Sequence, residues 1–292
     1  MNNAGKKLLS KTKSIRTLWG LDLNFKDTKV LFQQLKSIKQ TFDGIEVATG
    51  FFDPNHKSEF IKICKDLNLS IITQIHTNGY PIKSADMDVH LEDFKSKLED
   101  SLTWDPILIN SHSGTDYWRL EKNIEFFKNA DEITNKIIKS KIEVCHETHR
   151  QRILFNPFVT FEILKIVPNI KLTLDLSHWI LTSERLLSED SEFYWKELKN
   201  ILIKNTGLIH GRIGTVNSIQ VVDPEYFDNY EKYFYSIWKN IIEHSNRKEI
   251  YIDYEYGPEP YLFVNPITGT PFKNLGDVIN EQKIKFEKYL RT

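Results

Sequence analysis

The feature that most constrains the fold is a regular alternation of short apolar runs with longer polar segments. Eight runs rich in apolar and β-branched residues occur at 15–23, 42–48, 69–77, 106–111, 141–147, 170–176, 207–213 and 248–255. In the segments between them, apolar residues recur three and four positions apart, as at Leu31, Leu35 and Ile38, which predicts helices. Strands that alternate with helices pair in parallel through crossover connections.

Two α/β architectures fit this alternation, an open doubly wound sheet and a closed barrel. Eight repeats within 292 residues, with no Gly-x-Gly-x-x-Gly after the first run, favour a single (β/α)₈ TIM barrel. We expect a flexible tail over 1–13 and one barrel domain over 14–292, closed by a helix over 274–290. The long segments 215–228 and 256–271 are predicted to be loops over the barrel mouth.

Composition excludes several classes of protein. Lys and Arg number 39 and Asp and Glu number 40, and this near-zero net charge argues against nucleic acid as the main partner. Cys64 and Cys145 cannot form a disulfide framework, which indicates a reducing compartment. No segment has the apolar stretch of a signal peptide or of a membrane helix, so we expect a cytoplasmic protein without a membrane partner. Many barrels form homo-oligomers, and no sequence feature selects an oligomeric state.

Histidines and carboxylates gather at the predicted strand ends. Six of the nine histidines lie at or just after such an end, namely His76, His112, His146, His149, His178 and His210. Three carboxylates, Glu147, Asp175 and Glu255, lie there too. Because catalytic side chains of a barrel converge at the C-terminal ends of its strands, this distribution predicts a functional site at that rim.

Strand alternation predicts which of these side chains point inward. In the last run, Tyr251, Asp253 and Glu255 share one face, and the other face is apolar. The same alternation puts each of three further pairs on one face of its strand: Gln74 and His76, Asn110 and His112, and Thr173 and Asp175. Polar side chains that point into a barrel are costly to bury unless they bind something, and a metal ion explains them economically.

The predicted metal ligands come one each from the fifth to the eighth strands, and they are Glu147, Asp175, His210 and Glu255. Three carboxylates and one imidazole suit one Mn²⁺ or Mg²⁺ ion, with Co²⁺ and Zn²⁺ as alternatives. No cysteine joins the set, which argues against a structural zinc site.

At these residues the sequence resembles the xylose-isomerase-like (β/α)₈ superfamily. The resemblance rests on Glu147, Asp175-x-x-His178, His210 and Glu255, in that strand order. The segments His-Glu-Thr-His-Arg (146–150), Asp-Leu-Ser-His-Trp (175–179) and His-Gly-Arg-Ile-Gly (210–214) are similar to a subgroup labelled sugar phosphate isomerase/epimerase. The resemblance is specific over the fifth to eighth strands and weaker over the rest of the chain.

The resemblance implies a metal-dependent isomerase or epimerase of a sugar-like carbonyl compound, acting through an enediolate with Glu147 and Glu255 as the acid/base pair. It also implies that His178 and Arg212 bind substrate oxygens. His76 and His112 are expected to hydrogen-bond the substrate or the ligands. Arg150 suits an acidic group and Trp179 the C–H face of a sugar ring. No glycine-rich phosphate cradle follows the last two strands, so a phosphorylated substrate has no support.

Three alternatives stay open. His76 and His112 match additional metal ligands of endonuclease IV, a phosphodiester hydrolase, but Asp223-Pro-Glu225 has Glu where that pattern has His. A lyase similar to inosose dehydratase would use the same metal set. A barrel that only binds a ligand or a partner protein would keep the ligands without turnover. Counting the bound ions distinguishes the hydrolase from the isomerase.

Overall fold

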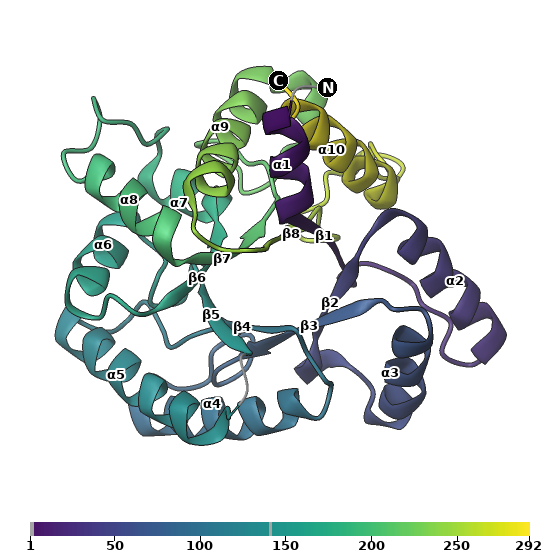
Figure 1. The fold of residues 1–292 in the computed structure, drawn as a ribbon, viewed down its shortest axis with the longest axis horizontal. Coiled ribbons are helices and arrows are strands. Elements are labelled where there is room, and N and C mark those ends of the chain that lie inside the picture. Colours follow the sequence, from purple (N-terminus) through teal and green to yellow (C-terminus); the bar gives the residue numbers. More distant parts are fainter. Residues whose placement is uncertain (1–2, 140–141) are drawn as a thin grey trace.

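The strands of the computed structural model, which describes residues 3–139 and 142–292, form a closed barrel (Figure 1). All strands are parallel and pair in chain order around the ring. The strands are β1 (Thr12–Thr17), β2 (Gly44–Ala48), β3 (Ser70–His76), β4 (Leu108–His112), β5 (Glu143–Glu147), β6 (Lys171–Asp175), β7 (Thr206–His210) and β8 (Ile250–Tyr254). The predicted (β/α)₈ barrel is therefore confirmed; Lys141, in the fifth predicted run, lies outside the described residues.

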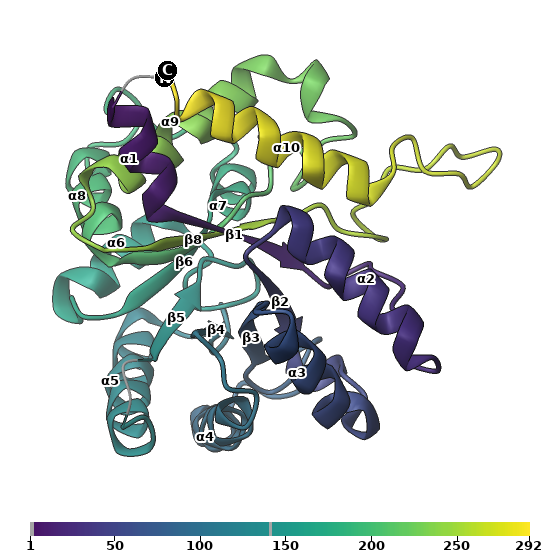
Figure 2. The ribbon, with the colours of Figure 1, turned by 45° about the vertical axis from the view of Figure 1, so that its right-hand side comes forward.

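Helices surround the strands in both ribbon views (Figures 1 and 2). They are α1 (Asn3–Lys11), α2 (Thr28–Thr41), α3 (Lys57–Asp66), α4 (Met87–Leu102), α5 (Leu120–Ile137), α6 (Pro157–Ile166), α7 (Leu176–Ser183), α8 (Trp195–Asn205), α9 (Asp228–His244) and α10 (Leu275–Tyr289). The last one matches the helix predicted over 274–290. None of the described helices is long and apolar enough to cross a membrane.

Several helices begin at a side chain that caps their free backbone N–H groups. Asp27, Asp86, Asn156 and Asn274 each accept hydrogen bonds from two backbone N–H groups in the first turn that follows. These acceptors satisfy donors that have no partner within the helix, which sets where the helix starts. The starts of these four helices are therefore encoded locally.

The N-terminal segment differs from its prediction. Instead of a tail over 1–13, residues Asn3–Lys11 form α1 and β1 starts at Thr12; residues 1 and 2 lie outside the described part. The Leu8 side chain is buried in the main core, and the Lys11 Nζ donates to the carbonyl oxygen of Ile242 at 2.8 Å. This helix was not predictable because its apolar partner surface is provided by distant helices.

The barrel interior is apolar at one level and polar at the next. A separate small cluster of Ile15, Ile72, Leu108, Cys145 and Leu208 fills the interior. Two residues further along the same strands, the inward side chains are polar: Thr17, Gln74, Asn110, Glu147 and His210. The strand register agrees with the predicted inward faces, because it pairs Gln74 with Asn110, His76 with His112 and His210 with Asp253. Because alternate residues of a strand share a face, the polar side chains form a layer next to the apolar layer, nearer the C-terminal ends of the strands.

Candidate functional site

The four predicted metal ligands lie together at the C-terminal mouth of the barrel. Glu147 ends β5, Asp175 ends β6, His210 ends β7, and Glu255 follows β8 by one residue. The Nδ1 atom of His210 lies 3.2 Å from Glu255 Oε2 and 3.6 Å from Glu147 Oε2. Asp175, His210 and Glu255 each offer a ligand atom within 4.8 Å of the others, and so do Glu147, Asp175 and His178. All of these side chains are buried.

Arg212 lies between two of these carboxylates. Its Nη2 donates to Asp175 Oδ2 at 2.5 Å, and its Nη1 lies 3.1 Å from Glu255 Oε1. Burial alone would raise the pKa of Asp175, but the Arg212 charge holds it well below its usual value. Arg212 therefore neutralises part of the negative charge of the centre.

Asp175 has a second task that explains its spacing to His178. It caps α7, and its Oδ1 accepts from the backbone N–H of Ser177 at 2.9 Å. Strand β6 thus passes directly into a helix, and one turn later His178 Nε2 lies 3.6 Å from Asp175 Oδ2 and 3.0 Å from Arg212 Nη2. The Asp-x-x-His motif is a strand end joined to a helix start.

Glu46 on β2 is a central residue that the sequence prediction missed. Its Oε2 lies 3.1 Å from His210 Nε2, so a proton on Nε2 directs Nδ1 toward Glu147 and Glu255. Asn110 Nδ2 donates to both Glu46 Oε1 at 2.9 Å and Glu147 Oε2 at 2.8 Å. The parity applied to the other strands would have found Glu46, because it alternates with Ile45 and Val47 in an otherwise apolar run.

The protonation of the centre reflects its excess of carboxylates. Burial raises the pKa of Glu147 to about 7. Burial alone would lower the pKa of His210, but the Glu147 and Glu46 carboxylates raise it well above its ordinary value. Burial, and then the neighbouring Glu46 charge, raises the pKa of Asp253. In the absence of a cation, bound protons therefore neutralise part of the negative charge of these carboxylates.

These residues fit a hard divalent cation. Within the described part of the chain, His210 Nδ1 and Glu255 Oε2 are buried, form no hydrogen bond to any other group and face each other at 3.2 Å. A buried nitrogen and a buried oxygen that converge in this way beside further carboxylates form a donor set for a cation. Arg212 uses the other Glu255 oxygen, so it supports this carboxylate from the side and leaves Oε2 facing His210.

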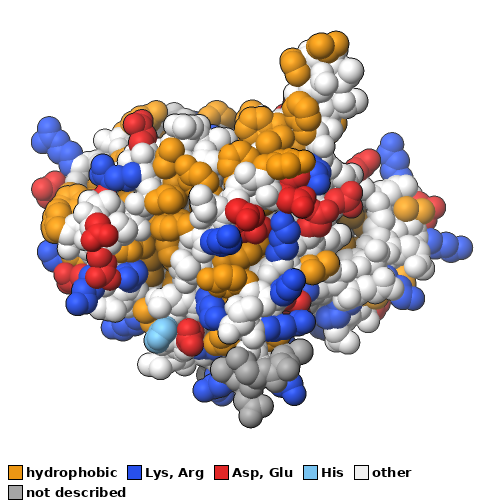
Figure 3. Space-filling model, turned by 90° about the horizontal axis from the view of Figure 1, so that it is seen from above, with side chains coloured by type: hydrophobic (Ala, Val, Ile, Leu, Met, Phe, Trp, Pro, Cys, Tyr) orange, Lys and Arg blue, Asp and Glu red, His pale blue; other side chains and the backbone are white. Residues whose placement is uncertain are grey.

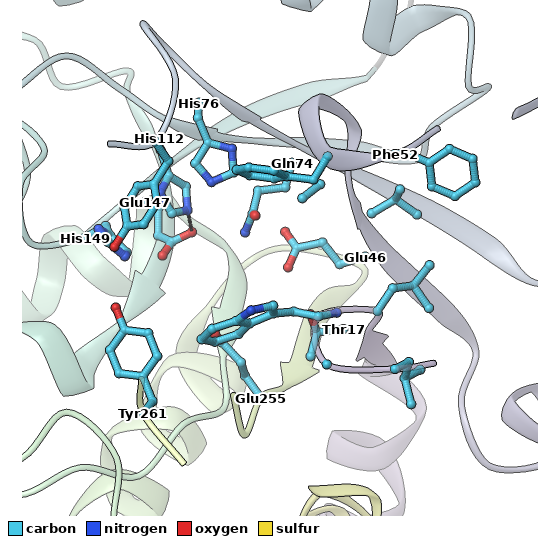
Figure 4. A pocket seen from close by; sticks show the side chains of 18 of the residues that line it. Thr17, Glu46, Phe52, Gln74, His76, His112, Glu147, His149, Glu255 and Tyr261 are labelled. Carbon is cyan, nitrogen blue, oxygen red and sulfur yellow. Dashed lines mark hydrogen bonds and ion pairs between the residues drawn. The ribbon is translucent and has the colours of Figure 1, made fainter. Parts of the chain in front are cut away.

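A row of four histidines lies at one side of the mouth, and all of them except His178 line the cavity. The successive ring centroids of His76, His112, His149 and His178 lie 4.2, 4.5 and 4.0 Å apart. Burial lowers the pKa of each ring well below its ordinary value, so all four are neutral. Figure 4 shows His112 against Glu147, and His112 Nε2 lies 2.7 Å from Glu147 Oε2. His149, which follows β5 by two positions, belongs to the predicted strand-end cluster, but no role was predicted for it.

Two other residues predicted to contact the substrate, Arg150 and Trp179, lie elsewhere, one at the rim and one in the core. Arg150 Nη2 donates to the Tyr261 hydroxyl at 3.0 Å, which places it at the rim. Trp179 is wholly buried in the main core, and its indole N–H donates to the Leu154 carbonyl oxygen at 2.9 Å. The assignment of Trp179 to substrate binding was therefore wrong, because α7 turns this side chain away from the cavity and toward the core.

The site opens into a cavity of about 460 Å³. Its polar end contains His76, His112, Glu147, Arg212 and Glu255. At the rim, the Trp19 ring packs edge-on against Tyr261 with centroids 5.3 Å apart. A Cβ atom on Gly257 would lie 2.2 Å from the Trp19 ring, so this rim requires glycine there.

The fold and the site define a (β/α)₈ barrel with a buried carboxylate and histidine centre at its C-terminal mouth. Its fold is that of the xylose isomerase-like TIM barrels, on the evidence of solved structures. No protein-family model matches the chain, and no curated protein matches it either.

Three solved structures illustrate the likeness. An L-ribulose 3-epimerase is 12% identical with a TM-score of 0.63, and the alignment covers 96% of each chain. A xylose isomerase-like TIM barrel protein from Mycobacterium smegmatis, in complex with magnesium, is 12% identical with a TM-score of 0.57 over 98% of each chain. The probable 3-DHS dehydratase of petrobactin synthesis from Bacillus anthracis is 16% identical, with a TM-score of 0.57 over 96% of this chain and 99% of that one.

The position of Glu46 leads to a test of the centre. Glu46→Ala should weaken Mn²⁺ binding by about 10- to 100-fold, because His210 Nε2 loses the acceptor that orients Nδ1. Isothermal titration calorimetry measures the change. Glu249→Ala removes a half-exposed carboxylate at the other end of the barrel and should leave the affinity unchanged. Equal Mn²⁺ affinity in the Glu46 variant and the native protein would contradict the orienting role.

Proposed function

We propose that this protein is a divalent-cation-dependent isomerase or epimerase of a sugar-like hydroxycarbonyl compound. One observation carries the proposal: His210 Nδ1 lies 3.2 Å from a Glu255 oxygen and 3.6 Å from a Glu147 oxygen, with Asp175 close by. The structural likeness to an L-ribulose 3-epimerase supports the same chemistry.

Mn²⁺ or Mg²⁺ would be held by Glu147, Asp175, His210 and Glu255, with Co²⁺ and Zn²⁺ as alternatives. When bound, such a cation polarises a carbonyl group and makes the neighbouring C–H more acidic. His210 is held in one orientation by Glu46, and Asp175 by Arg212 and by its role as the cap of α7. The ligands are thus positioned before a cation binds, which reduces the cost of binding.

Glu147 and Glu255 are assigned to proton transfer. They come from β5 and the end of β8, and both line the cavity. One carboxylate removes the proton next to the substrate carbonyl, and the other returns a proton. His112 Nε2, 2.7 Å from Glu147 Oε2, is placed to hold that carboxylate during the transfer. His76, His178, Arg150 and Arg212 are assigned to the oxygen atoms of the substrate.

Metal content and hydrogen exchange test the proposal together. Purified protein should contain about one Mn²⁺ or Mg²⁺ per chain, and it should exchange solvent deuterium into at least one member of a panel of ketopentoses, ketohexoses and inososes. Chelation with EDTA should remove the exchange, and added Mn²⁺ should restore it. Mass spectrometry of the recovered compounds gives the rate. Undiminished exchange by metal-free protein would contradict the proposal.

A dehydratase is the second candidate, favoured by the likeness to a probable 3-DHS dehydratase. The same proton abstraction would then be followed by loss of a β-hydroxyl group, leaving a conjugated carbonyl. Product mass distinguishes the two reactions, because dehydration removes one water and isomerisation leaves the mass unchanged.

A phosphodiester hydrolase has one favourable observation, the adjacent rings of His76 and His112 at the mouth. Two observations weigh against it. Asp223 pairs with Lys273 at 2.9 Å and caps a short 3₁₀ helix that contains Glu225. The net charge of the chain is close to zero, and on the side of the barrel seen in Figure 3 basic and acidic side chains are intermixed rather than gathered by sign. Three zinc ions per chain together with cleavage of abasic DNA would favour this candidate.

A further inference from the structure

The cavity has a second end that differs in character from the metal centre. Six apolar side chains line it and are called the apolar arm below: Leu18, Leu21, Leu23, Phe25, Val47 and Phe52. They come from the segment after β1 and from β2 with the segment that follows it. In Figure 4, Phe52 lies across the cavity from His149 and Glu147, with Glu46 between them. The cavity is therefore polar at one end and apolar at the other.

The wall of the apolar arm is part of the packed core. Phe52 packs edge-on against Trp104 with centroids 4.9 Å apart, and against Phe25 at 5.2 Å. Trp104 is buried in the second core cluster, on which Leu18, Leu23 and Phe25 also pack. The backbone N–H of Leu18 donates to the Glu46 carbonyl oxygen at 3.0 Å, which ties the arm to the strand that carries Glu46. The arm is thus a built surface and not a loose loop.

The chemistry of the arm selects what it can hold. Hydroxyl groups placed there would lose water without gaining partners, because none of the six side chains has a hydrogen-bonding group. An apolar group placed there gains about fourfold in affinity for each buried methylene. A fully hydroxylated sugar chain therefore fits the polar end and is a poor occupant of the arm.

We infer that the substrate is a hydroxycarbonyl compound that carries an apolar substituent, an alkyl chain or an aromatic ring. This inference rests on the proposed function, which puts the hydroxycarbonyl group beside Glu147 and Glu255. The substituent lies in the apolar arm and contributes to binding and positioning, while the chemistry takes place at the polar end.

Two hydroxamates test the inference, because a hydroxamate chelates a divalent cation through two oxygens and its tail can be varied. Calorimetry on the Mn²⁺-loaded protein compares acetohydroxamate with 4-phenylbutyrohydroxamate. The phenylbutyryl probe should bind at least about tenfold more tightly, from burial of its tail. In Leu21→Asp the ratio of the two affinities should fall to about two or less, because a charge then lies in the arm. Leu21 is half-buried, so this change is compatible with folding, and Leu21→Ser provides a milder second variant.

A matched control is Ile267→Asp, which changes an apolar side chain that is 92% exposed and lies outside the cavity lining, and it should keep the native ratio. Equal affinity for the two probes in the native protein, or a tenfold ratio that survives in Leu21→Asp, would overturn the inference and leave the proposed function standing. If neither probe binds in the presence of Mn²⁺, both the proposed function and the inference fall. If the long probe binds equally well without Mn²⁺, the arm is supported and the cation site is contradicted.

Discussion

Glu147→Gln and Glu255→Gln should each lower the rate of proton exchange into the substrate by about 10²- to 10⁴-fold, the usual contribution of a general acid or base. The amide keeps the size of the side chain but cannot accept a proton at neutral pH. Both carboxylates line the cavity and lie within 3.6 Å of His210 Nδ1, so each is also a proposed ligand. Exchange is therefore measured at saturating Mn²⁺, with bound metal determined in parallel.

The control for Glu147 lies on the same strand. Glu143 starts β5, pairs with Arg247 at the opposite end of the barrel and is remote from the cavity. Glu143→Gln should keep the native exchange rate. Circular dichroism checks that the variants are folded. A folded Glu147 or Glu255 variant that retains full exchange with its metal bound would refute the proton-transfer assignment for that residue.

Mild acid should destabilise the metal-free protein by a few kcal/mol between pH 7.5 and pH 5.5. Burial lowers the pKa of six histidines in the fold: His76, His90, His112, His146, His149 and His178. In the unfolded chain each has a pKa of about 6.5 and binds a proton as the pH falls, whereas the folded chain binds fewer protons at these six rings. The free energy of unfolding therefore falls by up to about 1.4 kcal/mol for each such histidine over this window.

Three groups oppose this loss. The raised pKa values of His210, Glu147 and Asp253 mean that the fold itself takes up protons there, so stability from these three is greatest at low pH. The net change remains a loss, because the six histidines together contribute more than the three opposing groups. Urea unfolding in EDTA at the two pH values measures it.

His146 isolates the contribution of one ring. Its pKa is lowered to about 3 by burial, and it lies outside the cavity lining, with Nδ1 2.6 Å from Ser113 Oγ. His146→Asn should reduce the pH-dependent loss by about 1.4 kcal/mol, whatever it does to absolute stability. His244→Asn, on the surface of α9, should leave the loss unchanged. Equal free energies of unfolding at the two pH values in the native protein would be inconsistent with neutral buried histidines.

Much of the barrel could be predicted from local patterns. Each of the eight apolar runs overlaps a strand of the structure, and α10 lies within one residue of its predicted ends. These features are local, because strand and helix periodicity are properties of neighbouring residues. The same parity placed Glu255 and Asp175 on the inward face, and it would have placed Glu46 there if it had been applied to β2.

The sequence by itself determined the order of strands and helices, and which strand ends carry carboxylates and histidines. Only the tertiary structure decided that Glu46 orients His210, that Arg212 joins Asp175 to Glu255, that Trp179 belongs to the core and that Asn3–Lys11 form a helix. The physical reason is that each of these contacts joins residues far apart in the chain or depends on how a helix is rotated against the barrel. Local periodicity contains no information on either.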